Sequence, residues 1–100
     1  MQGWTIGSMK NGSGTTATSA AQLTSADVPC DHGVCIKANP ANGGIVYVGF
    51  NSDLTAGSAA PTTDGFPLSA GEAIDLEIDN ANKVYVIGSD ASQKFHFIRR

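Results

Sequence analysis

Charged and aromatic residues are scarce in this 100-residue sequence: Asp, Glu, Lys and Arg make up 15%, and Phe, Trp and Tyr 7%. The small number of Lys and Arg residues leaves a net charge of −3. This argues against nucleic-acid binding, because nucleic-acid binders gather basic residues on one face. Apolar residues, at 41%, are nevertheless too abundant for a disordered chain. We therefore expect a globular domain with a single core.

Long hydrophobic runs are also missing. The apolar stretches fall far short of the ~20 residues that a membrane-spanning helix needs, so no membrane partner is expected. Residues 1–6 show neither a basic leader before an apolar run nor a small-residue cleavage site, so we expect no standard signal peptide. Two cysteines without an export signal favour reduced thiols in a cytosolic setting.

No segment carries helical spacing of apolar residues over three turns. Apolar and polar residues instead alternate in short segments bounded by Gly, Pro, Asn, Asp and Ser, as in β-strands: 34–38, 45–50, 73–79, 84–88 and 95–98. We expect one hairpin from the first two segments and another from the next two. The sequence therefore predicts an all-β fold, a β-sandwich or jelly-roll-like barrel of about seven short antiparallel strands.

Residues 1–21 differ from the rest because small and polar side chains dominate them. We interpret them as an extended N-terminal arm before a β-sandwich domain over 22–100, with a first strand entered near 16–24. Trp4, Ile6 and Met9 are the sizeable apolar side chains of this arm. Two interpretations stay open: these three side chains contact a partner subunit, or the arm folds back over Tyr47 or Tyr85.

Two thiols and an imidazole fall close together at Cys30, His32 and Cys35, a grouping that suggests zinc. Structural zinc sites usually need four ligands, and the only other histidine is His96, so we expect no metal ligands and no cofactor. A disulfide that closes the short loop and a pair of reduced thiols are the alternatives.

Patterns typical of catalysis are not recognisable. The G-x-S-x-G motif is absent, and neither His32 nor His96 has neighbours that suggest a catalytic triad. We therefore expect no catalytic residues and a protein that is not an enzyme. Asp75, Glu77 and Asp79 alternate along one side of a predicted strand, which would favour a basic partner or a cation. A solvated outer face explains this alternation as well.

Four motifs resemble those of small tailed-bacteriophage virion proteins: V-C-I-K-A at 34–38, I-V-Y-V-G at 45–49, G-F-P-L-S-A-G-E at 65–72 and V-Y-V-I-G at 84–88. The resemblance covers residues 22–98. It implies a capsid decoration, or cement, protein that binds the outer surface of the major capsid protein and stabilises the shell.

The same resemblance implies a homo-oligomer, often a trimer, on the capsid surface of the virion and in the host cytoplasm before assembly. Related modules in tails and head fibres imply an alternative function. In that alternative the β-sandwich binds host-surface carbohydrate through the long loop at 51–68, with Tyr47, Tyr85 or Asp64 as contacts.

Overall fold

The computed structural model describes residues 11–57 and 63–99. Within them the chain forms two antiparallel sheets of four strands each and one short 3-10 helix, so the predicted all-β class is confirmed. Sheet A holds β1, β8, β3 and β6 in that order, and sheet B holds β2, β7, β4 and β5. The bounds are β1 Asn11–Thr15, β2 Ala21–Gln22, β3 Val34–Ala38, β4 Val46–Gly49, β5 Phe66–Leu68, β6 Ala73–Leu76, the 3-10 helix η2 Ala81–Lys83, β7 Tyr85–Gly88 and β8 Lys94–Arg99.

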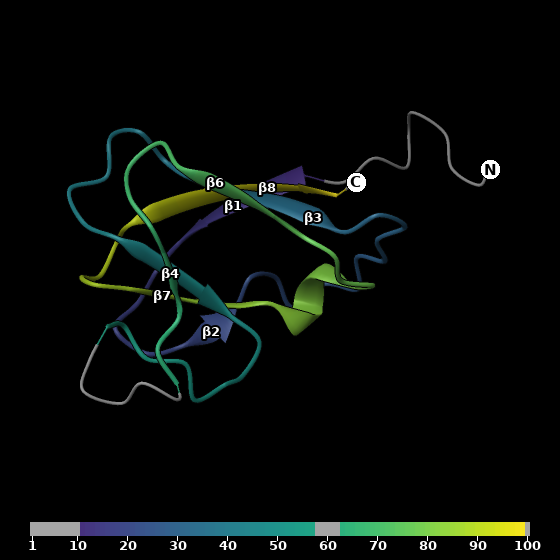
Figure 1. Ribbon diagram of the computed structural model, residues 1–100, viewed down its shortest axis with the longest axis horizontal. Coiled ribbons are helices and arrows are strands. Elements are labelled where there is room, and N and C mark those ends of the chain that lie inside the picture. The colour runs from purple at the N-terminus through teal and green to yellow at the C-terminus, as the bar shows by residue number, and fades with distance from the viewer. Residues whose placement is uncertain (1–10, 58–62, 100) are drawn as a thin grey trace.

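The chain crosses from one sheet to the other after almost every strand (Figure 1). Among the described strands, only β4 and β5 are neighbours both in sequence and in a sheet. The ladders are nested: β4 pairs with β5, β3 with β6, β2 with β7 and β1 with β8. They form one long antiparallel ribbon whose tip is the β4–β5 connection. Folding this ribbon over adds the β3–β8 and β4–β7 ladders and completes the two sheets.

Both predicted hairpins are wrong. Segments 34–38 and 45–50 contribute β3 to sheet A and β4 to sheet B, and segments 73–79 and 84–88 are divided in the same way between β6 and β7. Alternation of apolar residues specifies which face of a strand is buried but not which strand lies beside it. The loop after β3 is joined to β8 instead: the Asn42 side chain donates to Lys94 O and accepts from Lys94 N, at 2.8 Å each.

The described residues form eight strands, where about seven were expected. The prediction for 34–38 matches β3 in full, whereas the strand predicted at 73–79 ends at Leu76. Beyond Leu76 the chain leaves β3 and runs along the segment that precedes it, where Cys30 N donates to Asp79 O at 2.8 Å. The carboxylates at the end of the predicted strand therefore belong to a connection.

The N-terminal part of the described chain is paired in both sheets. In place of a first strand near 16–24, the chain forms β1 at the edge of sheet A and the two-residue β2 at the edge of sheet B. Part of the predicted arm, 1–21, therefore lies in strands. Residues 1–10 lie outside the described residues.

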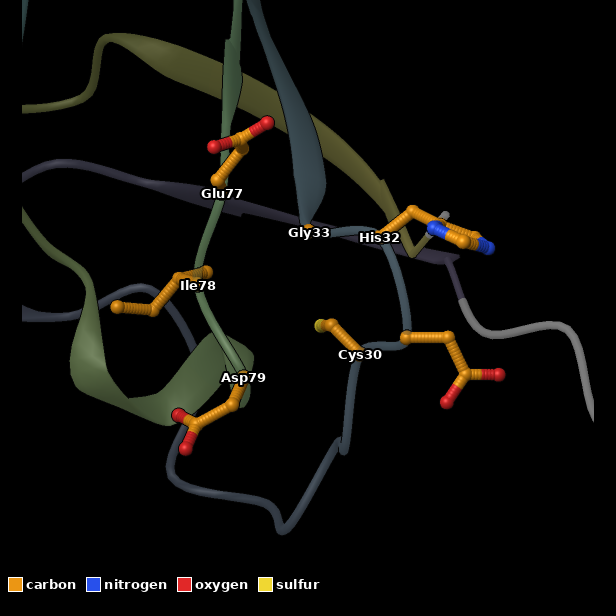
Figure 2. Close-up of a pocket in the computed structure, with 7 residues that line it drawn as sticks. Cys30, His32, Gly33, Glu77, Ile78 and Asp79 are labelled. Atoms are coloured by element: carbon orange, nitrogen blue, oxygen red, sulfur yellow. The ribbon is translucent and has the colours of Figure 1, made fainter.

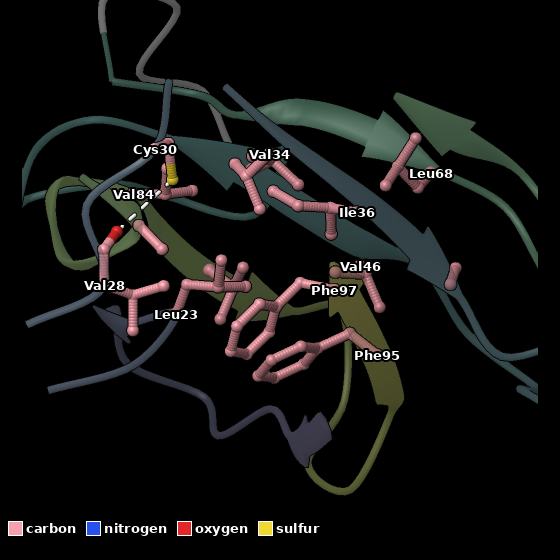
Figure 3. Packing of buried hydrophobic residues seen from close by; sticks show 14 residues of the cluster. Leu23, Val28, Cys30, Val34, Ile36, Val46, Leu68, Val84, Phe95 and Phe97 are labelled. Carbon is pink, nitrogen blue, oxygen red and sulfur yellow. Dashed lines mark hydrogen bonds between the residues drawn. The ribbon is translucent and has the colours of Figure 1, made fainter. Parts of the chain in front are cut away.

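A single hydrophobic cluster lies between the two sheets (Figure 3). β3 contributes Val34, Ile36 and Ala38, which are fully buried, and β8 contributes Phe95 and Phe97. Sheet B adds Val46, Val48, Leu68 and Val86. Full burial of a Val, Leu, Ile or Phe side chain contributes about 1.5–3 kcal/mol, so the alternation along each strand determines which face packs inward.

Strand β1 has no inward side chain, and phenyl rings of β8 occupy the space instead. Gly12 lies opposite Phe97, and Gly14 lies opposite Phe95. A Cβ atom on either glycine would lie 2.7 Å from a carbon of the facing ring. Aromatic rings that cover edge glycines in this way help to hold an edge strand in register. These contacts fix β1 on β8 although β1 contributes no apolar side chain.

Thr16 and Gln93 are buried polar residues at one end of the molecule. Thr16 Oγ1 donates to Asp90 O at 3.2 Å and accepts from Gln93 N at 3.1 Å, while Gln93 Oε1 accepts from Gly44 N at 2.8 Å. Among the described residues, no buried side-chain nitrogen or oxygen lacks a hydrogen-bond partner. This network joins the connections after β1, β3 and β7.

Candidate partner-binding surface

Side chains on the outer face of sheet A are open to solvent. β1, β6 and β8 direct exposed side chains outward, and β3 directs outward the exposed Lys37 and the half-buried Cys35. The exposed large apolar side chain on this face, among the described residues, is Ile98, whose exposed fraction is 41%. Ile98 lies between Asn11 of β1 and Cys35 of β3. Because both neighbours have short side chains, the isoleucine stays uncovered.

Polar and charged side chains share this face with Ile98. Lys94 and His96 project from β8 and Lys37 from β3, whereas Asp75 projects from the edge strand β6. His96 Nε2 forms a 2.9 Å hydrogen bond with the side-chain amide of Asn39. Protein-binding surfaces combine apolar and polar side chains in this way.

One edge of this face, at β1, carries backbone groups that no described strand pairs with. Thr16 N donates to the carbonyl oxygen of the residue before β8 at 2.8 Å. Residues of an antiparallel strand alternate between bonding one neighbour and pointing away from it. The two glycines of β1 therefore bond β8, and the N–H and C=O groups of Asn11, Ser13 and Thr15 point outward. In the described chain β8 is the only strand beside β1, so no described strand pairs with these groups.

The other sheet edges carry features that discourage pairing. β5 has Pro67 at its centre, which has no N–H to donate, and β6 carries Asp75. β2 is only two residues long. By contrast, β1 has five residues with no charge and no proline. Exposed edges without such protection recruit further strands.

A hollow of about 390 Å³ lies beyond β3 and β6 (Figure 2). It is lined by Cys30, Asp31, His32, Gly33, Glu77, Ile78 and Asp79. The chain passes its rim at Gly33, whose φ of +101° favours glycine and whose Cβ would overlap the carbonyl oxygen of Leu76. The predicted acidic row is thus divided, because Asp75 stays on sheet A while Glu77 and Asp79 reach the hollow.

The titratable groups of the hollow are held by local contacts. The Cys30 thiol is buried and donates to Val28 O at 3.3 Å. Burial raises the pKa of Cys30 above its ordinary value, although a backbone hydrogen bond from Ala81 opposes the change. A hydrogen bond from Lys83, whose Nζ lies 2.9 Å from Asp79 Oδ1, lowers the pKa of Asp79. Because a protonated thiol is a poor nucleophile and ligand, Cys30 has the character of a structural cysteine.

The structure does not bring Cys30, His32 and Cys35 together. No disulfide joins Cys30 and Cys35 in the described chain, and Cys35 lies on the outer face of sheet A. Figure 2 shows the His32 imidazole pointing away from the Cys30 thiol. Within residues 11–57 and 63–99, no group of three His, Cys, Asp or Glu side chains could hold a metal ion. Neither the zinc nor the disulfide alternative is therefore present in the described chain.

The connection between β4 and β5 covers part of the outer face of sheet B. Leu54 is buried there, and a Cβ on Gly49 or Gly65 would lie 2.5 or 2.8 Å from its Cδ1 atom. The outer side of β4 is therefore covered by a loop of this chain.

This loop also engages two of the three residues expected to contact carbohydrate. The Tyr47 ring lies against Gly57, and Asp64 Oδ1 accepts a hydrogen bond from Thr55 Oγ1 at 2.6 Å. Tyr85 is half-buried on β7. These contacts do not present the three side chains as an open sugar platform.

Two phenyl rings near the end of β4 are exposed, although the alternation of the sequence does not mark them as surface residues. The exposed fractions of Phe50 and Phe66 are 53% and 57%. Phe66 lies opposite Val48, near the end of β4 after which Phe50 follows. Their positions beside the polar 51–65 loop are a signal that could have separated them from core residues.

The predicted contact residues Trp4, Ile6 and Met9 lie outside the described residues. Their segment leads directly into β1, beside Ile98. Sequence reasoning missed Ile98 as a surface residue, although its alternation with the buried Phe95 and Phe97 indicates the outer face.

No helix in the described chain has the length and apolar character needed to cross a membrane. No protein-family model, curated protein sequence or solved structure matches this chain.

Proposed function

We propose that this chain is a non-enzymatic structural protein of a tailed-bacteriophage virion. In this role it binds the outer surface of the major capsid protein and stabilises the shell as a capsid decoration protein. It acts as a homo-oligomer on the capsid surface, after a period in the host cytoplasm, and Trp4, Ile6 and Met9 contribute to the partner contact.

The strand order is the observation that carries this proposal. Sheets with the orders β1-β8-β3-β6 and β2-β7-β4-β5, joined by nested antiparallel ladders, are what a rolled-up ribbon of eight strands produces. We assign this arrangement to the jelly roll, a fold that recurs in viral capsid proteins as well as in lectins and cupins. One fold hosts several functions, so residue motifs must add to the support from topology.

The motifs behind the phage resemblance occupy the strands and turns that build these sheets. The V-C-I-K-A motif is β3, and the I-V-Y-V-G and V-Y-V-I-G motifs contain β4 and β7. The turn in G-F-P-L-S-A-G-E is closed by Glu72, whose Oε1 accepts from Ser69 N at 2.7 Å, and Gly71 N donates to Ala38 O at 3.0 Å. Most of these motif residues therefore build the two sheets, while Cys35 and Lys37 of the first motif lie on the outer face of sheet A.

Heads from a phage that lacks this protein test the proposal. Added protein should co-sediment with the heads at a fixed stoichiometry and raise the temperature at which they rupture. Trp4→Ala should weaken binding by about tenfold or more, since interface tryptophans contribute strongly. Phe66→Ala is the matched control, because Phe66 is exposed but belongs to sheet B.

The proposal fails if the wild-type chain does not bind heads. Binding to tails or to a glycan array in place of heads would support the carbohydrate-binding alternative.

A further inference from the structure

We propose that the β1 edge of sheet A and a hollow beside it form a docking site for an extended segment of a partner protein. The segment adds to sheet A as an antiparallel strand next to β1 and places one apolar side chain in the hollow. That the segment belongs to the major capsid protein rests on the proposed function. The docking site itself does not.

Two backbone hydrogen bonds on the two sides of β8 establish which groups of β1 face away from the sheet. At the end of β1, Thr16 N donates to Gln93 O at 2.8 Å. On the other side of β8, Asn39 N donates to Lys94 O at 3.1 Å, so Lys94 bonds the β3 side and the next residue, Phe95, bonds β1. Both bonds assign the two glycines of β1 to β8 and direct the N–H and C=O groups of its other three residues outward.

The outward groups match those of another extended strand. Asn11, Ser13 and Thr15 each offer one N–H and one C=O, and groups two residues apart in a strand are separated by about 6.8 Å. The groups of an extended peptide recur at the same spacing, whereas a compact ligand reaches only some of them. β1 carries no charge and no proline that would oppose a new neighbour. Within residues 11–57 and 63–99 only β8 pairs with β1, so no strand of that part uses this edge.

A hollow of about 290 Å³ lies along the same edge. The first three residues of β1 line it. Its lining also includes three buried members of the hydrophobic cluster: Leu23, Val28 and Phe97 (Figure 3). An apolar cavity of about 150 Å³ already holds a benzene molecule, so this hollow has room for one large side chain. The lining therefore favours an apolar side chain from outside the sheet.

A strand beside β1 directs alternate side chains toward this hollow. Residues directly opposite one another in an antiparallel ladder share a face. The residue opposite Gly12 therefore projects inward, to the side where the Phe97 ring lies under β1. The residues opposite Asn11 and Ser13 project with them onto the outer face of sheet A. The segment that fits has polar residues at these two outer positions and a residue such as leucine between them.

A second copy of β1 does not fill this site. Matching hydrogen bonds requires that the outward residues of one β1 pair with the outward residues of the other, for example Ser13 with Ser13 of the second copy. The glycines then face the hollow in every such register, and no side chain enters it. Main-chain bonds from an edge combined with a pocket for an alternate side chain are the usual way in which an extended peptide is recognised.

An NMR titration of the full chain with the synthetic peptide acetyl-K-T-A-T-L-T-K-amide tests the docking site. When the central threonine pairs with Ser13, the leucine lies opposite Gly12, and the terminal lysines keep the peptide soluble. Binding should shift the amide signals of Asn11, Ser13 and Thr15 and slow their hydrogen exchange. The matched peptide with serine in place of leucine should bind about tenfold more weakly or less, since no apolar side chain then enters the hollow.

Ser13→Pro separates the edge from the rest of the fold. The Ser13 N–H points away from β8, so proline removes a donor of the docking site and leaves the bonds to β8 in place. We expect peptide binding to weaken by about tenfold or more, whereas the matched variant Ser13→Ala should bind as the wild type does. A peptide with an N-methyl group on its central threonine makes the same test on the unaltered protein.

The docking site is refuted if millimolar peptide leaves the β1 amide signals unchanged, or if the serine peptide binds as well as the leucine peptide. Amides of Asn11, Ser13 and Thr15 that are already protected in the free protein would also refute it. Protection that is lost on dilution would identify a second copy as the neighbour of β1, and protection independent of concentration would identify another part of the same chain.

Head binding separates this inference from the proposed function. Ser13→Pro should weaken binding to phage heads by about tenfold or more, and the leucine peptide should compete with the heads for the wild-type chain. Unchanged head binding by Ser13→Pro would refute the major capsid protein as the source of the segment, while the titration still decides the docking site. A wild-type chain that does not bind heads would refute the proposed function and leave the titration result to stand.

Discussion

The two edge strands of sheet A, β6 and β1, differ in the features that would prevent a further strand from pairing with them. At β6 the edge carries Asp75, and the chain beyond the strand is fixed where Gly33 passes against the Leu76 carbonyl. At β1 the edge has no charge and no large side chain, and it is held from below by the rings of Phe95 and Phe97. One edge is closed by its own residues, whereas the other is fixed in place and has no further strand beside it among the described residues.

The largest effect is expected where the β6 edge is fixed by backbone. In Gly33→Ala a Cβ at a φ of +101° would overlap a carbonyl oxygen that cannot move without β6. We expect the free energy of unfolding to fall by about 3 kcal/mol or more, measured by urea denaturation. Gly43→Ala is the control, because nothing lies within 4 Å of its Cβ, and it should change stability by less than about 1 kcal/mol. Equal effects of the two variants would contradict the comparison.

A smaller effect is expected at the β1 edge, because a side chain rather than backbone is in the way. Gly12→Ala would place a Cβ 2.7 Å from the Phe97 ring, which must move aside. We expect a loss of about 1–3 kcal/mol in the same measurement. Ser13→Ala, on the outer face of the same strand, should stay within about 0.5 kcal/mol. If Gly12→Ala were as mild as Ser13→Ala, the rings would not be what holds β1.

Replacing the proline that protects the edge strand β5 should change self-association of the protein more than its stability. Pro67→Thr gives β5 a complete set of backbone donors, so we expect concentration-dependent self-association in analytical ultracentrifugation. The free energy of unfolding should change by about 0.5 kcal/mol or less. Pro40→Thr, in the loop after β3, should not associate. A Pro67→Thr chain whose sedimentation is independent of concentration would show that Pro67 does not protect this edge.

The same contrast explains what the sequence could predict. β3 was predicted in full because its alternation and its flanking turns are local properties. The hairpins were wrong because alternation specifies a buried face and not a neighbour, and the nested pairing of distant strands has no local signal. β1 could not be predicted from its own residues, since its inward positions are glycines covered by rings that lie more than eighty residues later.

The candidate surface was predictable only in part. The outward direction of Ile98 follows from its alternation with Phe95 and Phe97, but its exposure depends on Asn11 and Cys35, which pairing brings beside it. Cys30 and Cys35 were grouped by closeness in sequence. The structure separates them because the chain turns at Gly33 and directs Cys35 to the outer face of sheet A. Proximity along the chain does not specify a shared site when a turn lies between.

The smallest effect is expected for the ion pair between Lys83 and Asp79, which lies beyond β6. This prediction tests whether the ion pair or the backbone contact at Gly33 fixes this side of sheet A. Lys83 lowers the pKa of Asp79 below its ordinary value of 3.8, so the pair adds stability above that pH and loses it as the pH falls through the folded pKa. The Asp79 carboxyl should therefore titrate below 3.8 in an NMR experiment, and Lys83→Gln should move its midpoint back toward 3.8. With exposed fractions of 57% for Lys83 and 74% for Asp79, solvent screens the pair, so Asp79→Asn should scarcely change the unfolding temperature at neutral pH. A midpoint at or above 3.8 would mean that Lys83 does not stabilise the Asp79 carboxylate. A large loss of stability at neutral pH would mean that the ion pair, and not Gly33, fixes this side of sheet A.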